Sequence, residues 1–223
     1  MKKSFAIKKF YIYFAIQSTL NMEERNYLKD IQDIKSMMDK SSQFISLSGL
    51  SGVLAGIYAL IGAYIVKFQI ASQPESVVTL ESLAFKYIIA TAATVLILSV
   101  VTAFIFTHFK AKKENEKVWN STSKRMAVNF LIPLLTGGIF AIILVDRAYY
   151  ELIAPVTLLF YGLSCINASK YTLRDVRYLG ITIVILGLLS AAIPGYTLEF
   201  WALGFGVCHI IYGSIMHFKY DSK

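Results

Sequence analysis

Six apolar stretches, separated by polar connections, constrain this chain more than any other feature. They lie near residues 44–66, 87–108, 126–145, 152–168, 178–193 and 200–218. A bilayer core of roughly 30 Å takes about 20 apolar residues in a helix, which is close to the length of each stretch. The chain has 223 residues, of which 56% are hydrophobic and 16% charged, too apolar for a soluble domain of this size. The sequence therefore predicts an all-α, polytopic membrane bundle of six transmembrane helices.

The lysines and arginines are sorted between alternate connections, and this predicts the orientation. Of the 22, eight lie in residues 1–43, six in the second-to-third connection, three in the fourth-to-fifth and two in the C-terminal tail. The opposite connections hold Lys67, Lys86 and Arg147. The positive-inside rule then predicts an integral protein of the plasma (inner) membrane with cytoplasmic N and C termini. The net charge of +8 is explained by this topology, so we expect membrane lipids as partners and no nucleic acid.

The predicted domain order begins with an N-terminal extension, residues 1–21. Lysines flank a short apolar run at 10–16 that is too short to cross a bilayer. Two interpretations are open: an interfacial anchor on the inner leaflet, or a mis-assigned start with translation beginning at Met22. The second is favoured because Met22 opens directly onto a well-formed helix. The six-helix domain is expected to span 44–218, followed by a cytoplasmic tail at 219–223.

Residues 22–43 are predicted to form a cytoplasmic amphipathic helix. Its apolar face carries Tyr27, Ile31, Ile34 and Met38. These residues recur at the spacing of a helix face, and Ser36 lies largely on the other side. Two interpretations are open. The helix rests on the membrane or on the bundle, or residues 23–40 form a docking or oligomerising site for a cytosolic protein partner. A homo-oligomer is a further option.

Small residues gather on one face of the first apolar stretch and of the last. The glycines concerned are Gly49, Gly52, Gly56, Gly206 and Gly213. Without a side chain, such positions let two membrane helices approach closely. We therefore expect these glycines to mediate helix packing, with a substrate groove as the alternative.

Polar residues are scarce inside the predicted spans, and His209 is the one titratable group at mid-depth outside tyrosine and cysteine. The candidate polar pocket consists of His209, Tyr212, Asn129, Asn167 and Tyr161. Alternatively, each of these groups bonds a neighbouring helix and stabilises packing by about 0.6 kcal/mol. Because no Asp, Glu, Lys or Arg lies near a span centre, proton-coupled transport and ion pumping are disfavoured.

Pro133 lies inside the third stretch, four residues after Asn129. Proline has no N–H to bond the carbonyl four residues back, which is the carbonyl of Asn129. A break in the backbone ladder and a polar side chain therefore coincide in the same half of this span.

No catalytic, cofactor or metal motif stands out, so we expect no enzymatic activity and no cofactor. Cys165 and Cys208 are both inside predicted spans, without ligand or CxxC spacing, and are expected to act as small apolar fillers. His108 and His217 lie at the same predicted depth, where two histidines could ligate a haem or a metal. This is the weakest of the alternatives, because nothing fixes their spacing.

Several sequence runs resemble an uncharacterised group of small six-helix bacterial integral membrane proteins. These runs are EERNYLKDIQDIKSMM, FISLSGLSGVLAGIYALIGAYI, LLFYGL, ASKYTL, RYLG and FWALGFGVCHIIYGSIMHFKY. The resemblance covers residues 22 to about 220. It implies the six-helix fold and carries no established activity or catalytic residue to transfer.

Three classes of function stay open at this point. The first is a non-enzymatic membrane sensor, anchor or regulatory partner that acts through its cytoplasmic N-terminal helix. The second is a transporter or channel for a small neutral or lipidic solute, with a polar path past His209 and Asn129. The third is a membrane haem protein or enzyme that uses His209, or His108 with His217.

Overall fold

This computed structural model describes residues 44, 47–71, 82–114 and 118–221, and six long apolar helices account for most of them. All of them belong to the compact unit 43–223. The six candidate spans are Gly49–Ala71, Leu83–Lys113, Ser121–Asp146, Tyr150–Ala168, Asp175–Ala192 and Thr197–Asp221. The prediction of an all-α fold is confirmed for the described residues, which include six helices long and apolar enough to cross a membrane. The extension 1–21 and the amphipathic helix with its face Tyr27, Ile31, Ile34 and Met38 lie outside the described residues.

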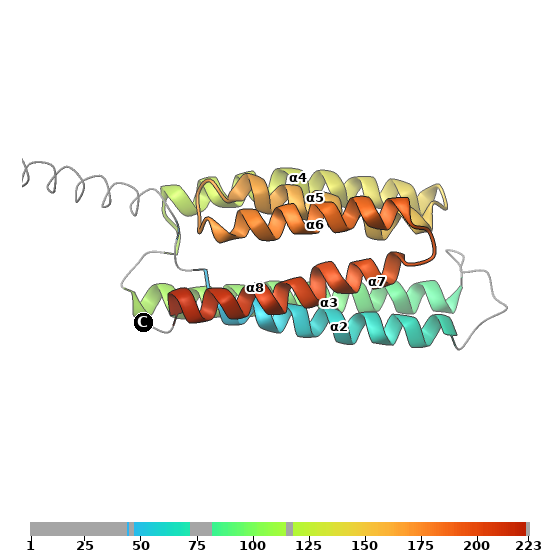
Figure 1. Cartoon of the computed structure of the whole chain (residues 1–223), viewed down its shortest axis with the longest axis horizontal. Coiled ribbons are helices and arrows are strands. Elements are labelled where there is room, and N and C mark those ends of the chain that lie inside the picture. Colours follow the sequence, from blue (N-terminus) through green and yellow to red (C-terminus); the bar gives the residue numbers. More distant parts are fainter. Residues whose placement is uncertain (1–43, 45–46, 72–81, 115–117, 222–223) are drawn as a thin grey trace, which may run out of the picture. The chain divides into compact units, whose positions relative to one another are not determined.

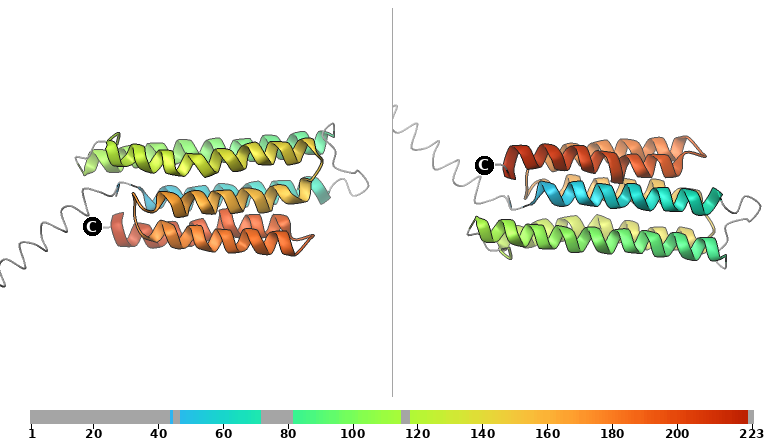
Figure 2. Two further views of the ribbon diagram at one scale, coloured as in Figure 1. Left: turned by 90° about the horizontal axis from the view of Figure 1, so that it is seen from above. Right: turned by 90° about the horizontal axis from the view of Figure 1, so that it is seen from below.

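The helices form two layers of three (Figures 1 and 2). In one layer α2 (Gly49–Ala71) lies between α3 (Leu83–Lys113) and α8 (Cys208–Met216). In the other layer α5 (Ile153–Ala168) lies between α4 (Ser121–Asp146) and α6 (Asp175–Ala192). The short 3-10 helix η1 (Tyr150–Leu152) precedes α5. The layers meet where the last span packs against α6.

The last span changes its helical geometry along its length. It begins as α7 (Thr197–Trp201), widens into the π-helix η2 (Ala202–Val207), continues as α8 and ends in a second π-helix, η3 (His217–Asp221). The helix therefore includes three residues that the sequence analysis assigned to a tail beginning at 219. This extension brings a carboxylate, Asp221, onto the end of the bundle.

Helices α3 and α4 are longer than the apolar stretches that revealed them. Helix α3 begins after Ser82, whose side-chain oxygen accepts from the Phe85 N–H at 3.1 Å. Helix α4 begins after Asn120, which forms a reciprocal capping box with Ser123. Such caps satisfy N–H groups that have no partner in the first helical turn. The polar residues at the start of α4 and the basic residues at the end of α3 lengthen these helices beyond the part that hydropathy detects.

The outer surfaces of α3 and α4 are strongly apolar. Large exposed side chains on the two helices include Leu96, Ile97, Phe104, Ile132, Leu135, Ile139 and Ile142. In water such a surface would favour aggregation, whereas in a bilayer it is the face that meets lipid tails. This distribution fits the assignment of these helices as membrane spans.

Helix α2 and the last span, through its parts η2 and α8, approach each other at glycines. A Cβ atom on Gly56 would lie 2.6 Å from the carbonyl oxygen of Gly206, and one on Gly213 would lie 2.6 Å from the carbonyl oxygen of Gly49. A Cβ atom on Gly52 would lie 3.3 Å from the Cα atom of Gly213, a less close contact. The structure thus places all five predicted packing glycines along one contact, where the absence of a side chain is what permits backbone-to-backbone proximity.

Candidate functional site

His209 is 7% exposed, and both of its ring nitrogens are hydrogen-bonded. Nδ1 lies 2.9 Å from the carbonyl oxygen of Gly204, and Nε2 lies 2.7 Å from the hydroxyl oxygen of Tyr161. A carbonyl can only accept, so Nδ1 carries the proton and donates to Gly204. In a neutral ring, Nε2 is then the acceptor of the Tyr161 hydroxyl, and both ring nitrogens are satisfied.

The π-helix η2 explains why the Gly204 carbonyl is free to receive this bond. In an α-helix the Cys208 N–H would donate to Gly204, four residues back. Here the Cys208 N–H donates to the carbonyl of Leu203, five residues back. The Gly204 carbonyl therefore does not receive the Cys208 N–H, and the Nδ1–H of His209 donates to it instead. Single π-turns are frequent at functional sites, but here the histidine repairs the backbone of its own helix.

Asn167 replaces a backbone hydrogen bond that is missing in α4. Its Nδ2 donates to the carbonyl oxygen of Asn129 at 2.9 Å, the carbonyl that Pro133 cannot bond. The side chain of Asn129 donates within its own helix, to the carbonyl of Arg125 at 2.8 Å. This pair joins α4 to α5 and has no bond to His209. The polar pocket expected from the sequence is thus divided into separate bonded pairs.

Tyr212, the fifth residue of the predicted pocket, belongs to neither pair. Its side chain packs against the buried cluster that contains Cys165 and Met216. Its hydroxyl oxygen is buried and has no hydrogen-bond partner among the described residues. The ring of Tyr161 lies between α4 and the last span, where it contacts Phe130 and Phe205. The hydrogen bonds of the described residues do not join these five residues into one network.

The two histidines considered as haem or metal ligands have different neighbours. His108 stacks on Phe104, with ring centroids 6.4 Å apart. His217 donates from Nδ1 to a carboxylate oxygen of Asp221 at 3.3 Å. Across the described parts of the chain, no group of three or more His, Cys, Asp or Glu side chains is placed to hold a metal ion.

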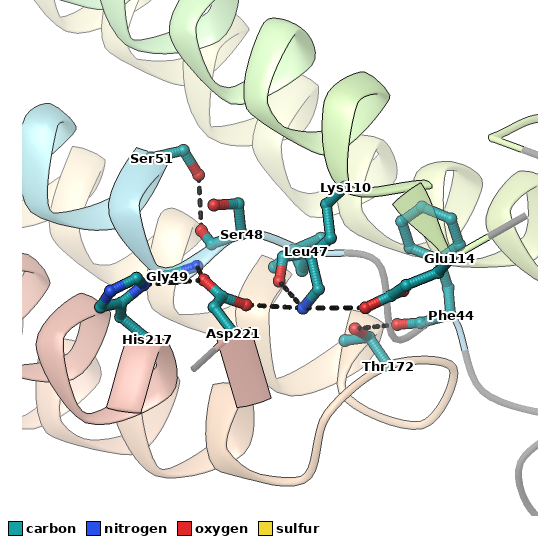
Figure 3. Close-up of polar contacts among 10 residues, drawn as sticks. All are labelled: Phe44, Leu47, Ser48, Gly49, Ser51, Lys110, Glu114, Thr172, His217 and Asp221. Atoms are coloured by element: carbon teal, nitrogen blue, oxygen red, sulfur yellow. Dashed lines mark hydrogen bonds and ion pairs between the residues drawn. The ribbon is translucent and has the colours of Figure 1, made fainter. Parts of the chain in front are cut away.

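A denser polar site lies where the chain enters α2 (Figure 3). This is at the basic end of the bundle, defined as the end at which α2, α4 and α6 begin. Phe44 is 2% exposed, and its backbone is bonded on both sides. Its N–H donates to the carbonyl of Tyr171 at 2.7 Å, and its carbonyl accepts from Thr172 Oγ1 at 2.7 Å. The α5–α6 connection therefore holds the backbone just before the first span.

Asp221 is the centre of the same site. Its Oδ2 accepts from the backbone N–H of Gly49 at 2.9 Å and from His217, while its Oδ1 accepts from Lys110 Nζ at 2.7 Å. Lys110 also donates to the carbonyl of Leu47 at 3.0 Å. Glu114 lies 4.0 Å from the same ammonium. We call the set Phe44, Leu47, Gly49, Lys110, Thr172, His217 and Asp221 the junction.

The charges of the junction suit their positions. The Asp221 carboxylate lies against the N-terminus of α2, where the helix dipole favours negative charge. The side chains of Lys110 and Asp221 are only 10% and 11% exposed, so solvent screens their attraction poorly. By contrast, Lys67 and Glu199 pair at the opposite end of α2 with side chains 68% and 45% exposed. A buried pair is costly to break from one side, because the remaining charge is left without compensation.

A second ionic contact fixes the last turn of the chain to α6. Lys219 Nζ and the hydroxyl of Tyr220 both donate to Asp175 Oδ2 at 2.8 Å. The π-helix η3 is thus bonded to α2 and α3 through Asp221, and to α6 through Asp175. Both layers of the bundle converge on this turn.

Sequence reasoning missed most of the junction. Lys110 was counted only as a topological charge, and Asp221 was assigned to a tail. The available signal was the spacing of His217 and Asp221, four residues apart as on one helix face. The partners of Asp221 lie 111 and 172 residues away, and no local pattern identifies them.

Comparison with known proteins adds no family to this description. No protein-family model matches the chain, and no curated protein or solved structure shows significant similarity to it. The resemblance to small six-helix membrane proteins stays an expectation from the sequence.

Proposed function

We propose that this chain is a non-enzymatic, multi-pass protein of the plasma membrane that acts as a membrane sensor or anchor for a cytosolic protein. Residues 23–40 are the docking element, and both termini face the cytoplasm. The bundle provides the membrane-embedded body to which this element is attached. The charge asymmetry of the connections supports the orientation.

The observation that carries this proposal is the junction. Residues from α3, from the α5–α6 connection and from η3 all bind the short segment through which the N-terminal residues join the bundle. A segment that served only as a loose tether would not need bonds from three separate parts of the fold. A docking element that must report on the bundle, or be held by it, does need a fixed point of attachment.

The bonding of the intramembrane polar groups also favours this function over a solute path. His209 has both nitrogens engaged, and the Asn129 carbonyl is bonded by Asn167. A solute would have to compete with these bonds to be recognised. These bonds support the alternative in which the polar residues stabilise the packing of the helices.

Deletion of residues 23–40 tests the docking element. The truncated chain should insert in the membrane as the full-length chain does, and it should lose the proteins that co-purify with the full-length chain from native membranes. A finer test replaces one apolar residue, Ile34→Asp, and compares it with Ser36→Asp on the other face. The first should abolish co-purification and the second should preserve it. Retention of every partner by the truncated chain would refute the proposal.

A reporter fused after Lys223 tests the orientation separately. We expect a reporter that is active only in the cytoplasm to be active in this fusion. Activity of a reporter that works only outside the cytoplasm would invert the topology and would place the junction on the wrong side for a cytosolic partner.

A further inference from the structure

Cations and an exposed tryptophan gather where α3 ends and α4 begins, at the basic end of the bundle. We call this set the cationic patch: Lys112, Lys113, Trp119, Lys124 and Arg125. All five residues are exposed, Trp119 at 67%. The Lys124 ammonium lies 5.9 Å from the centre of the Trp119 ring, so the tryptophan lies beside the first turn of α4. A short connection thus brings the cations of two helix ends into one region of the surface.

The carboxylates that the structure describes do not neutralise the cationic patch. Asp221 and Glu114 both lie against Lys110. Asp175 accepts from Lys219. Among the described residues, no ion pair includes any of the four cations of the patch. Within this part of the chain the patch therefore carries a positive charge that an anionic partner would match.

The surface one turn further into each helix is apolar. Phe109 on α3 and Val128 on α4 are exposed, and Phe104 and Leu131 continue the same surfaces towards the middle of the bundle. The two helices form one lateral edge of the bundle, and their main packing partners are α2 and α5 (Figure 2). A molecule bound at this edge would meet cations at one end and exposed hydrocarbon along the rest of its length.

We propose that the cationic patch binds acidic phospholipids, with the headgroup phosphate against the four cations and the acyl chains along the exposed faces of α3 and α4. Clusters of Lys and Arg beside a membrane span attract acidic headgroups, and tryptophan favours the depth at which headgroups lie. A soluble anion would match only the charge, whereas a phospholipid matches both the charge and the apolar surface. The bilayer is thus the source of the ligand.

This site gives the proposed membrane sensor its signal, and to that extent the inference rests on the proposed function. Occupancy of the cationic patch follows the acidic-lipid content of the leaflet that contains it. The site requires only that α3 and α4 span a bilayer, and it contains no residue of the docking element 23–40. Lipid binding can therefore be measured apart from docking.

Trp119 reports the bound lipid directly, because brominated acyl chains quench tryptophan fluorescence on contact. Trp201→Phe leaves Trp119 as the one tryptophan of the full-length chain, and this chain is the parent. It is reconstituted in phosphatidylcholine vesicles that contain a minor fraction of brominated phosphatidylglycerol or, separately, of brominated phosphatidylcholine. Both leaflets have the same composition, so the orientation of the chain does not affect the reading. A second chain, Trp119→Phe, leaves Trp201 as a reporter at the other end of the bundle.

We expect brominated phosphatidylglycerol to quench Trp119 more strongly than brominated phosphatidylcholine at the same fraction. Lys113→Gln combined with Lys124→Gln should lower this preference for the acidic lipid by about fivefold or more, because each cation near an acidic membrane surface contributes about that factor. Lys112→Gln combined with Arg125→Gln should do the same. Two independent pairs guard against one that fails to fold, and recovery of each variant in detergent is measured alongside.

The matched control removes the same charge from the same end of the bundle. Lys170→Gln combined with Arg177→Gln alters the α5–α6 connection and the start of α6, and it should leave the preference at Trp119 unchanged. Equal quenching by the two lipids in the parent would overturn the site. So would an equal loss of preference in this control, or an equal preference at Trp201, since either would show a general attraction to the whole protein.

The vesicle measurement also separates this inference from the proposed function, because the vesicles contain no other protein. If the parent shows no preference for the acidic lipid, the site is refuted, and docking through 23–40 is still decided by co-purification after deletion of those residues. If the truncated chain retains every partner, the proposed function fails, and the quenching of Trp119 still decides whether the lipid site exists.

Discussion

Asn167 donates its side-chain N–H to the one backbone carbonyl of α4 that Pro133 leaves without a helical partner, that of Asn129. The contact spans 38 residues of sequence and joins neighbouring helices at 2.9 Å. It explains how proline is accommodated inside a membrane helix, because backbone groups freed in a bilayer must be bonded by a neighbour. The asparagine thus acts on the backbone of another helix.

This relationship predicts a specific coupling between two substitutions. Asn167→Ala should destabilise the protein by about 1–2 kcal/mol, because it leaves the Asn129 carbonyl, in a part-buried contact between two helices, without a hydrogen bond. In a Pro133→Ala background the same change should cost much less, since an alanine at that position supplies the missing backbone N–H. The free energies of unfolding of the four chains in detergent measure this double-mutant cycle. Equal costs in the two backgrounds would show that Asn167 does not serve the freed carbonyl.

The glycine contact between α2 and α8 predicts opposite effects for two similar substitutions. Gly56→Ala places a Cβ 2.6 Å from the carbonyl oxygen of Gly206 and 2.9 Å from the amide nitrogen of Ile210, so the helices must separate. We expect a loss of about 1–3 kcal/mol, the usual cost of overpacking. Gly138→Ala meets no atom within 4 Å and should be neutral or stabilising by up to about 1 kcal/mol, because alanine favours helix. Thermal unfolding of both variants in the same detergent provides the comparison.

The sequence predicted the spans well because membrane insertion depends on local properties. Hydropathy is summed over neighbouring residues, and a helix bonds its own backbone. The periodicity of Gly49, Gly52 and Gly56 likewise indicated a packing face on the first span. It could not indicate which helix would occupy that face, because pairing between distant segments leaves no local signal. The presence of Gly206 on the opposing surface is known only from the structure.

The polar residues were harder to interpret because their roles depend on partners. His209 and Asn129 were assigned to one candidate pocket because both are polar residues inside spans, whereas their bonds run to Gly204, Tyr161 and Asn167. The π-turn that exposes the Gly204 carbonyl has no sequence signature that hydropathy detects. For the same reason the pair Lys110–Asp221 was missed, since its members are 111 residues apart.

The bonding of His209 predicts its tautomer. Because the carbonyl oxygen of Gly204 can only accept, Nδ1 should carry a proton, and because the side chain is buried, the ring should be neutral. Nitrogen NMR of the labelled histidine should therefore show a protonated Nδ1 and an unprotonated Nε2. Tyr161→Phe removes the donor to Nε2 and should preserve this tautomer, while lowering stability by about 0.6–1.5 kcal/mol. A proton on Nε2 in the parent chain would contradict the assignment to the backbone of η2.

The ion pair between Lys110 and Asp221 should behave differently from the exposed pair at the other end of α2. Asp221→Asn and Lys110→Met should each destabilise the protein by about 3 kcal/mol, because each leaves a poorly solvated charge behind. Glu114, 4.0 Å from Lys110, compensates part of the loss in the first variant, so the second should cost more. Glu199→Gln, which breaks a pair with exposed side chains, should cost no more than about 1 kcal/mol.

The double variant decides whether the two charges act as a unit. With Lys110→Met and Asp221→Asn combined, neither charge is left unpaired, so the total loss should be smaller than the sum of the single losses by about 1 kcal/mol or more. Raising the salt concentration should weaken Lys67–Glu199 and barely change Lys110–Asp221, since burial limits screening. Unfolding titrations of these four chains and of Glu199→Gln, at low and high salt, measure both effects. Strict additivity, or equal salt dependence at the two sites, would mean that the two side chains act on the entry of α2 independently, Asp221 through Gly49 and Lys110 through Leu47.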